Sequence, residues 1–140
     1  MKLIINTDGS SIGNPGPSGV GYVIREPSGD TLLLLEEHSE PIGCATNDYA
    51  EYRAVIRGLE RAVELGADEV ELRCDSLIVV RQIDGTCAAK DPALRDLCRR
   101  ARALMGKIQR CEITHVYSTN NLDADFLAKK ASAREKGRRR

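Results

Sequence analysis

The hydrophobic positions at the start of the chain predict three strands. Residues 2–5 form a short apolar, β-branched run, which is typical of a strand buried on both faces. Residues 20–24 and 31–35 are two further apolar runs, and the turn-forming residues 27–30 between them predict a hairpin. A rigid Gly/Pro-rich loop at residues 13–17 precedes the hairpin. We therefore expect the sheet to begin as an antiparallel meander.

Helical and strand patterns alternate along the rest of the chain. The clearest helix pattern covers residues 46–66. Thr46 or Asn47 can cap its first turn, and Gly66 can end its last turn. After it come a strand at 69–74, a short helix at 77–83, an arginine-rich helix at 92–107, a strand at 111–117, and a last helix beginning at Asn120 or Asn121. This order predicts an α/β fold with a five-stranded mixed sheet flanked by helices on both faces.

Four carboxylates lie where a soluble fold rarely leaves a charge without a partner. Asp8 follows the first strand and Asp75 follows the fourth. Because the long helix joins these strands, we expect them to be parallel neighbours that bring Asp8 and Asp75 to the same sheet edge. Glu51 lies on the apolar stripe of that helix, and Asp125 lies in the first turns of the last helix. The topology thus predicts that these acids gather at one cleft.

Each of these acids alone has a simpler structural explanation. Asp8 could open a turn with Gly9, and Asp75 could cap the helix that follows it. Burying an unpaired carboxylate costs several kcal/mol, however, so a group of them needs cations, hydrogen bonds or an open cleft. Hard oxygen ligands suit Mg²⁺ or Mn²⁺, and two such ions about 3.5–4 Å apart serve in-line displacement at a phosphodiester. The sequence therefore favours phosphoryl chemistry.

The charges are distributed unevenly, although the formal net charge is zero. Residues 1–80 contain 6 Lys/Arg and 14 Asp/Glu, a net charge of −8. Residues 81–140 contain 15 Lys/Arg and 7 Asp/Glu, a net charge of +8. A solvated surface is one account of this asymmetry, and a basic half that binds nucleic acid is the other.

Composition indicates one soluble domain. The 140 residues are 41% hydrophobic, contain no apolar run near the length of a membrane span, and begin without a signal-peptide pattern, so we expect a cytoplasmic monomer with no membrane partner. The five cysteines lack metal-ligand spacing and are interpreted as reduced, packed thiols. We expect the domain to cover residues 1–133, with residues 134–140 as a disordered basic tail.

Five short motifs occur in order along the chain. They are Thr7-Asp8-Gly9-Ser10, Gly13-Asn14-Pro15-Gly16, Thr46-Asn47 with Ala50-Glu51-Tyr52, Cys74-Asp75-Ser76, and Asn121-x-x-Ala124-Asp125-x-Leu127-Ala128. Over roughly residues 2–132 the chain resembles type 1 ribonuclease H, in the compact form without a basic protrusion or a hybrid-binding domain. The resemblance implies the ribonuclease H-like fold. It also implies endonucleolytic hydrolysis of the RNA strand of RNA–DNA hybrids, leaving 5′-phosphate and 3′-hydroxyl ends.

The resemblance also implies a set of site residues. The catalytic and metal-binding residues are Asp8, Glu51, Asp75 and Asp125, which would hold two Mg²⁺ or Mn²⁺ ions. Asn14 and Asn47 would contact 2′-hydroxyls or bases in the minor groove, where RNA differs from DNA. Thr46 would help to hold a phosphate of the DNA strand. The remaining substrate-side residues are Gly9, Ser10 and Ser76. The partner is an RNA–DNA hybrid, with double-stranded RNA as a further candidate.

Several positions depart from the family pattern. Residues 118–120 lack the histidine that many members carry before the last helix, and His115 lies in a predicted strand, where a packed or surface role is expected. Ser118 stands where relatives often have arginine, and Asp48 stands in place of the usual asparagine. Residues 85–90 lack the aromatic and extra basic residues often seen there. These differences concern affinity and rate rather than the class of reaction.

Two other interpretations remain open at the level of the sequence. A non-catalytic binder of hybrids or double-stranded RNA could have kept the fold, but clustered negative charge beside phosphate gives such a binder no advantage. Another phosphoryl-transfer enzyme, such as a resolvase or transposase core, could share the same sheet. A cleavage assay with several duplexes distinguishes these interpretations.

Overall fold

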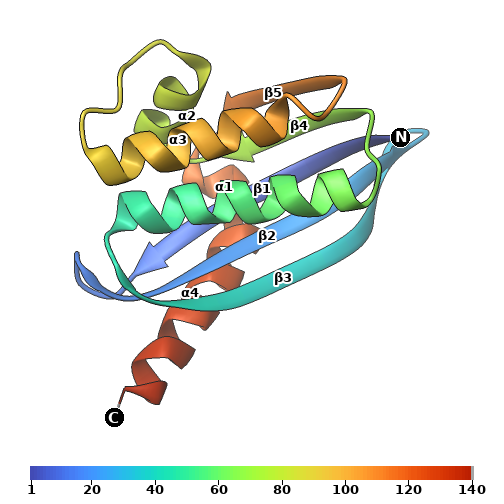
Figure 1. Cartoon of the computed structure of the whole chain (residues 1–140). Coiled ribbons are helices and arrows are strands. Elements are labelled where there is room, and N and C mark those ends of the chain that lie inside the picture. The colour runs from blue at the N-terminus through green and yellow to red at the C-terminus, as the bar shows by residue number, and fades with distance from the viewer. Residues whose placement is uncertain (140) are drawn as a thin grey trace.

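The computed structural model describes residues 1–139 and contains one mixed sheet with helices on both faces (Figure 1). Its strands lie in the order β3-β2-β1-β4-β5. The elements are β1 (Lys2–Ser11), β2 (Gly16–Ser28), β3 (Thr31–Ala45), α1 (Asn47–Glu64), β4 (Glu69–Cys74), α2 (Leu77–Asp84), α3 (Pro92–Met105), β5 (Arg110–His115), the short 3-10 helix η1 (Ser118–Asn120) and α4 (Leu122–Arg138). The predicted fold class is confirmed. Within residues 1–139, each helix is too short or too polar to cross a membrane.

The sheet brings the first and fourth strands together, as predicted. β1 pairs with β2 in the antiparallel sense and with β4 in the parallel sense. The last parallel pair joins Thr7 and Cys74, so Asp8 and Asp75 follow at the same end of adjacent strands. Asp8 itself lies within β1, which is longer than the predicted run because its second half continues pairing with β2.

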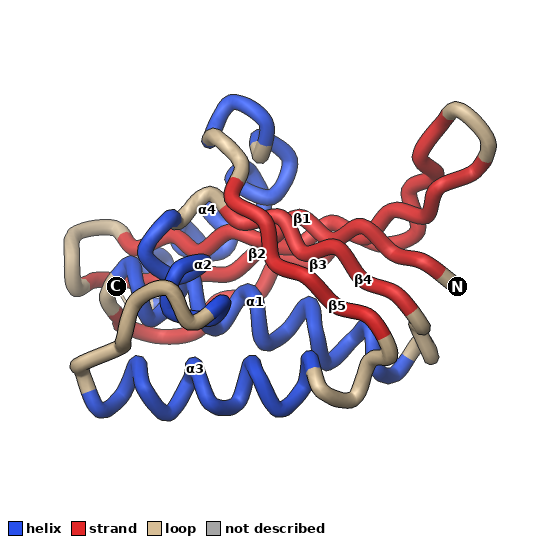
Figure 2. The backbone as a smooth tube through the Cα atoms, turned by 90° about the horizontal axis from the view of Figure 1, so that it is seen from above, coloured by secondary structure: helices blue, strands red, loops and turns tan. Residues whose placement is uncertain are grey.

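The two faces of the sheet are covered differently. α1 and α3 lie side by side on one face (Figure 2). The core on this side includes the fully buried side chains of Leu3, Ile5, Tyr52, Leu59 and Leu72. Burying such side chains stabilises the fold by about 1.5–3 kcal/mol each relative to exposure. This packing fixes α1, and with it Glu51, against the end of β1.

α4 packs on the other face, over glycines of β2. A Cβ atom at Gly21 would lie 2.6 Å from the Ala124 carbonyl oxygen, and one at Gly19 would lie 2.4 Å from the Ala131 Cβ. Real side chains do not tolerate such distances, so glycine at both positions lets α4 approach the sheet closely. Gly21 is the partner of Asp8 in the sheet, which places Asp8 on the α4 face.

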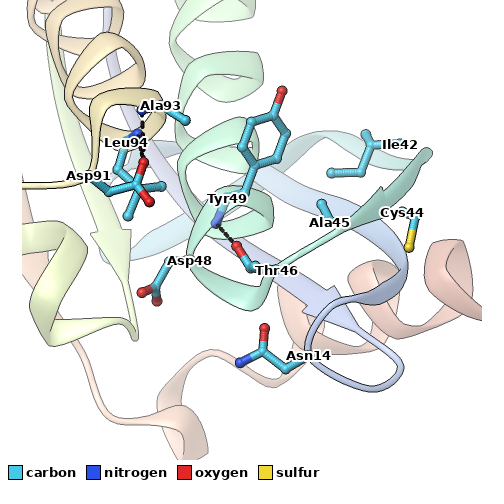
Figure 3. A pocket seen from close by; sticks show the side chains of 10 residues that line it. All are labelled: Asn14, Ile42, Cys44, Ala45, Thr46, Asp48, Tyr49, Asp91, Ala93 and Leu94. Atoms are coloured by element: carbon cyan, nitrogen blue, oxygen red, sulfur yellow. Dashed lines mark hydrogen bonds between the residues drawn. The ribbon is translucent and has the colours of Figure 1, made fainter.

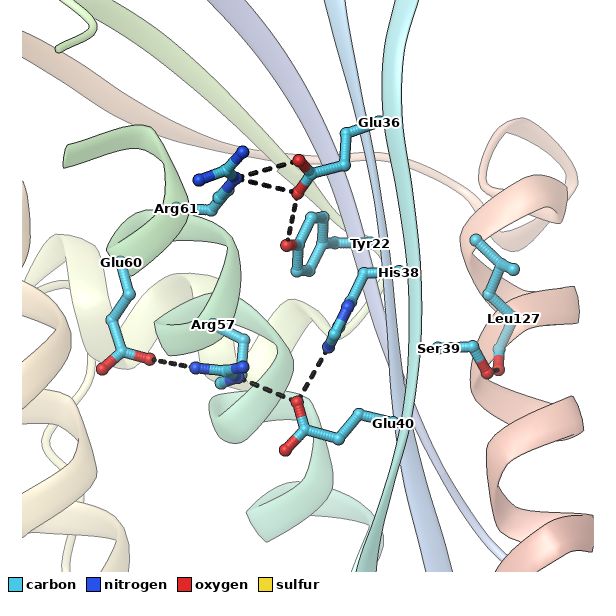
Figure 4. Close-up of polar contacts among 9 residues, drawn as sticks. All are labelled: Tyr22, Glu36, His38, Ser39, Glu40, Arg57, Glu60, Arg61 and Leu127. Carbon is cyan, nitrogen blue, oxygen red and sulfur yellow. Dashed lines mark hydrogen bonds and ion pairs between the residues drawn. The ribbon is translucent and has the colours of Figure 1, made fainter. Parts of the chain in front are cut away.

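The edge strand β3 is tied to both helical layers by polar side chains (Figure 4). The Arg61 guanidinium donates to Glu36 at 2.9 Å, and that of Arg57 donates to Glu40 at 2.9 Å. Ser39, which points to the opposite face, donates to the Leu127 carbonyl of α4 at 2.7 Å. Partly exposed ion pairs contribute little individually, but this ladder fixes the register of β3 against α1.

The prediction of a disordered tail is wrong for residues 134–138, which form the end of α4. The cause is Glu135, which is 6% exposed. Its carboxylate accepts a hydrogen bond from the Gly43 backbone N–H at 2.8 Å and another from Arg139 at 3.2 Å. Because Glu135 is bound to β3 in this way, the helix continues through Arg138. Residue 140 lies outside the described residues.

Candidate active site

Three carboxylates from three different elements meet at the end of β1. Asp8 of β1, Glu51 of α1 and Asp75, directly after β4, each offer an oxygen within 4.8 Å of the others. Asp8 is 4% exposed and Glu51 is 8% exposed. Asp75 is not a helix cap, because Ser76 occupies the N-cap position of α2 and accepts from the Val79 N–H at 3.4 Å. The structure thus brings together three of the four predicted acids.

Glu51 is held by backbone and thiol donors. Its Oε1 accepts a hydrogen bond from the Gly9 N–H at 3.0 Å, and its Oε2 accepts from the Cys74 thiol at 3.7 Å. A Cβ at position 9 would lie 2.3 Å from the Ala50 carbonyl carbon, so only glycine permits this approach. Sequence reasoning missed Cys74 as a partner, although its position directly before Asp75 placed it beside the site.

Asp125, the fourth predicted acid, lies at the side of the same cleft. Its Oδ2 forms an ion pair with Lys129, one turn further along α4, at 3.1 Å. The cleft has a volume of about 480 Å³. Its lining includes the four acids together with Gly9, Ser10, Asn47 and Ser76. Eight of the ten predicted site residues therefore surround one cavity.

Burial and mutual repulsion change the acidity of this cluster. Burial is the largest cause of the raised pKa of Asp8, and its hydrogen bond with Glu51 and the charges of Glu51 and Asp75 add to it. Burial also raises the pKa of Glu51 to about 7, although hydrogen bonds from Asp8 and Gly9 act in the opposite direction. In the absence of metal, burial therefore favours the form in which the Asp8–Glu51 pair keeps a proton. A divalent cation would supply the positive charge that replaces this proton.

Asn14 and Thr46 line a neighbouring pocket of about 560 Å³ (Figure 3). This pocket lies between the end of β3 and the first turns of α1 and α3. The Thr46 hydroxyl caps α1 by accepting from the Tyr49 N–H at 3.2 Å, which leaves its own O–H to donate. Asp48 and Asp91 also line the pocket, so it combines a hydroxyl donor with two acidic groups.

The two predicted minor-groove asparagines fix each other's loops. Asn14 Oδ1 accepts from the Asn47 backbone N–H at 3.0 Å, and Asn47 Oδ1 accepts from the Ser11 N–H at 3.1 Å. Since a backbone N–H group only donates, the side-chain oxygen of each asparagine is the atom that accepts within the protein. The side-chain NH₂ of each asparagine is then the group that can donate to another molecule. Both residues are exposed. They therefore present donors, which suit the oxygen acceptors of a minor groove.

Asn121 is a positioning residue, which the sequence indicated as a candidate helix start and as the first residue of the last motif. It is 2% exposed and makes no side-chain capping bond to α4. Instead its Nδ2 donates to the Thr7 carbonyl at 2.9 Å, and its Oδ1 accepts from Asn6 at 3.0 Å. These bonds fix the start of α4 against β1. The amide of Asn6, beside the apolar run of the first strand, was the signal in the sequence.

His115 lies in a strand, as predicted, and Ser118 begins the short helix η1. His115 ends β5 and packs edge-on against Tyr117, with 5.7 Å between ring centroids. Ser118 lines the cleft with its small hydroxyl side chain. Among the described residues that line the cleft, Lys129 is the one cation and histidine is absent.

Comparisons with known proteins agree with this architecture. The model of the Reverse transcriptase-like family matches residues 6–131. Ribonuclease HI of Halobacterium salinarum is 44% identical over 124 residues, which cover 89% of this chain and 61% of the relative. A bifunctional protein of Mycobacterium tuberculosis is 43% identical over 131 residues, which cover 94% of this chain and 35% of the relative. The chain thus spans about a third of the mycobacterial protein.

Solved structures match over nearly the whole chain. The N-terminal RNase H domain of the Mycobacterium tuberculosis protein is 40% identical, with a TM-score of 0.92 and 99% of each chain covered. LC11-RNase H1 in complex with an RNA/DNA hybrid is 36% identical, with a TM-score of 0.85, and the match covers 94% of this chain and 97% of that one. Sheet order and cleft define a ribonuclease H-like protein. The chain belongs to the type 1 ribonuclease H family, in its compact form.

Proposed function

We propose that this chain is an endonuclease that hydrolyses the RNA strand of RNA–DNA hybrids and leaves 5′-phosphate and 3′-hydroxyl ends. The observation that carries the proposal is the meeting of Asp8, Glu51 and Asp75 within 4.8 Å at the end of adjacent parallel strands. Asp125 lies at the side of the same cleft. The similarity to ribonuclease HI and to a hybrid-bound relative supports the substrate class.

The residues of the cleft fit divalent cations. Clustered carboxylates are the ligands that Mg²⁺ and Mn²⁺ prefer. Burial is the main cause of the raised pKa values of Asp8 and Glu51, and a bound cation would favour their ionised forms. We assign the ligand roles to Asp8, Glu51, Asp75 and Asp125. When bound, two such ions would activate water and stabilise the leaving oxygen of the phosphodiester.

The chain itself would position the substrate around this cleft. Asn14 and Asn47 present NH₂ donors toward the minor groove, where 2′-hydroxyls identify the RNA strand. Thr46 offers an O–H to a phosphate of the DNA strand from the neighbouring pocket. The Gly9 N–H holds Glu51 in place, while Ser10 and Ser76 line the cleft beside it. Asp48 lines both cavities and adds negative charge, which should weaken binding.

The direct test is a cleavage assay with four end-labelled substrates of one sequence: RNA–DNA hybrid, double-stranded RNA, duplex DNA and single-stranded RNA. We expect Mg²⁺- or Mn²⁺-dependent cleavage of the RNA in the hybrid, with 5′-phosphate on the downstream fragment. Treatment with a 5′-phosphate-dependent exonuclease verifies that end. Hybrid binding without cleavage in either metal would instead identify a non-catalytic binder. Equal cleavage of duplex DNA would identify a different phosphoryl-transfer enzyme.

Asn47→Asp should weaken hybrid binding with little loss of stability. Aspartate keeps the oxygen that accepts from Ser11 but replaces the outward NH₂ donor with an acceptor and a negative charge. Losing one good substrate hydrogen bond corresponds to roughly 1–2 kcal/mol, or about a tenfold change in affinity. Binding is measured in Ca²⁺ to suppress turnover, and thermal unfolding is measured in parallel.

The control for Asn47→Asp is Asp48→Asn, which changes charge by one unit in the opposite sense at the adjacent position. It should strengthen binding of hybrid and duplex DNA alike, because charge does not distinguish the sugars. If Asn47→Asp weakens both duplexes equally, the asparagine acts only through charge and its assignment to the 2′-hydroxyl face is wrong.

A further inference from the structure

The Lys129 side chain forms an ion pair with Asp125, the fourth acid of the cleft. Asp125 and Lys129 are one turn apart on α4, and the ammonium nitrogen lies 3.1 Å from Asp125 Oδ2. Both residues line the cleft that contains Asp8, Glu51 and Asp75. The Lys129 side chain is 69% exposed, whereas that of Asp125 is 30% exposed. The ammonium therefore reaches the carboxylate from the solvent side.

The charge around the cleft makes this contact significant. Among the described residues of its lining, five are acidic and one is basic. The acids are Asp8, Asp48, Glu51, Asp75 and Asp125, and the base is Lys129. Lys129 is thus the internal counter-ion of a site that is otherwise negative.

We propose that Lys129 is a positioning residue that occupies Asp125 before metal binds and is displaced from it when a divalent cation enters. The inference rests on the proposed function, since it assigns Asp125 to the metal site. A carboxylate that binds an ammonium ion has less negative charge to offer a divalent cation, and the two cations repel each other across a few ångströms. Since Lys129 is mostly exposed, moving its ammonium back into water costs little. Lys129 therefore lowers metal affinity and delays full assembly of the four-acid site.

The test measures binding of Mn²⁺ alone, by titration calorimetry at low salt, without substrate or turnover. Lys129→Met removes the competing ammonium and keeps the aliphatic stem, and we expect it to tighten Mn²⁺ binding about three- to tenfold. Lys130→Met is the matched control, since Lys130 is the next residue of α4, is exposed and lies outside the cleft lining of the described chain. It should change the affinity less than about twofold.

Two further variants separate competition for Asp125 from a general effect. Lys129→Arg keeps the cation and should restore an affinity near that of the wild type. In an Asp125→Asn background, Lys129→Met should have little additional effect, because the contested carboxylate is gone. Thermal unfolding of each variant confirms that it is folded.

The outcomes distinguish this inference from the proposed function. Tighter Mn²⁺ binding by Lys129→Met, with Lys130→Met near wild type, supports the displacement. Equal effects of the two methionine variants, or weaker binding by Lys129→Met, overturn it while leaving the metal site intact. If the wild-type chain binds no Mn²⁺, the metal-dependent function is wrong and the inference falls with it.

Discussion

Asp8→Asn is expected to reduce hybrid cleavage to less than about a thousandth of the wild-type rate while leaving the fold intact. The substitution keeps the size of the side chain but removes the carboxylate that we assign as a metal ligand at the centre of the cluster. Initial rates on a labelled hybrid, measured at saturating Mg²⁺ and again at saturating Mn²⁺, provide the comparison. Asp30→Asn, the same chemical change at an exposed turn residue, should keep the wild-type rate.

The same variant should be more stable than the wild type in EDTA. Asp8 is 4% exposed and burial raises its pKa, so the folded wild type keeps this carboxyl protonated at a free-energy cost that an uncharged amide does not have. Thermal unfolding in EDTA measures this effect independently of activity. A folded Asp8→Asn protein that cleaves hybrids at the wild-type rate would falsify the assignment of Asp8 as a metal ligand.

The stability of the metal-free protein should fall as the pH rises from about 5 to about 8. Burial raises the pKa of Glu51 from 4.5 to about 7, and the pKa of Asp8 lies far above its usual range. Across this window the unfolded chain releases protons that the folded cluster keeps, so the unfolded state binds fewer protons and gains relative stability as the pH increases. For Glu51 alone the loss is on the order of 3 kcal/mol, and it is complete above a pH of about 7.

Urea unfolding in EDTA at a series of pH values measures this loss. Asp8→Asn should flatten the dependence, because it removes the carboxyl whose pKa is raised furthest, while burial still raises the pKa of Glu51. Saturating Mg²⁺ should also flatten or reverse the dependence, since the ion binds the ionised carboxylates of the folded state alone. A free energy of unfolding that rises steadily from pH 5 to pH 8 in EDTA contradicts the protonated cluster.

The topology of the site could be predicted from the sequence because it depends on local patterns. Strand patterns before Asp8 and Asp75, with a helix pattern between them, were enough to predict two parallel neighbours whose ends meet. Glu51 was likewise identified from its position on the apolar stripe of α1, and it is 8% exposed in the structure. In each case the periodicity of one element determined where the carboxylate lies.

Contacts between distant segments could not be predicted in this way. The end of α4 depends on Glu135 reaching a backbone N–H of β3, and the composition of residues 134–140 indicated only a charged tail. The mutual hydrogen bonds of the Asn14 and Asn47 loops depend on how two turns approach each other. Such hydrogen bonds form only when the folded chain brings distant segments together, and no local sequence pattern specifies them.

The four-acid cleft is complete only when α4, which carries Asp125, packs closely on Gly19 and Gly21. The sheet strands, α1 and the cluster of Asp8, Glu51 and Asp75 are all encoded before α4, which carries Asp125. Since the N-terminal part of a chain leaves the ribosome first, a nascent chain has three of the four acids before α4 can dock. The four-acid cleft would therefore form later than the cluster of three acids.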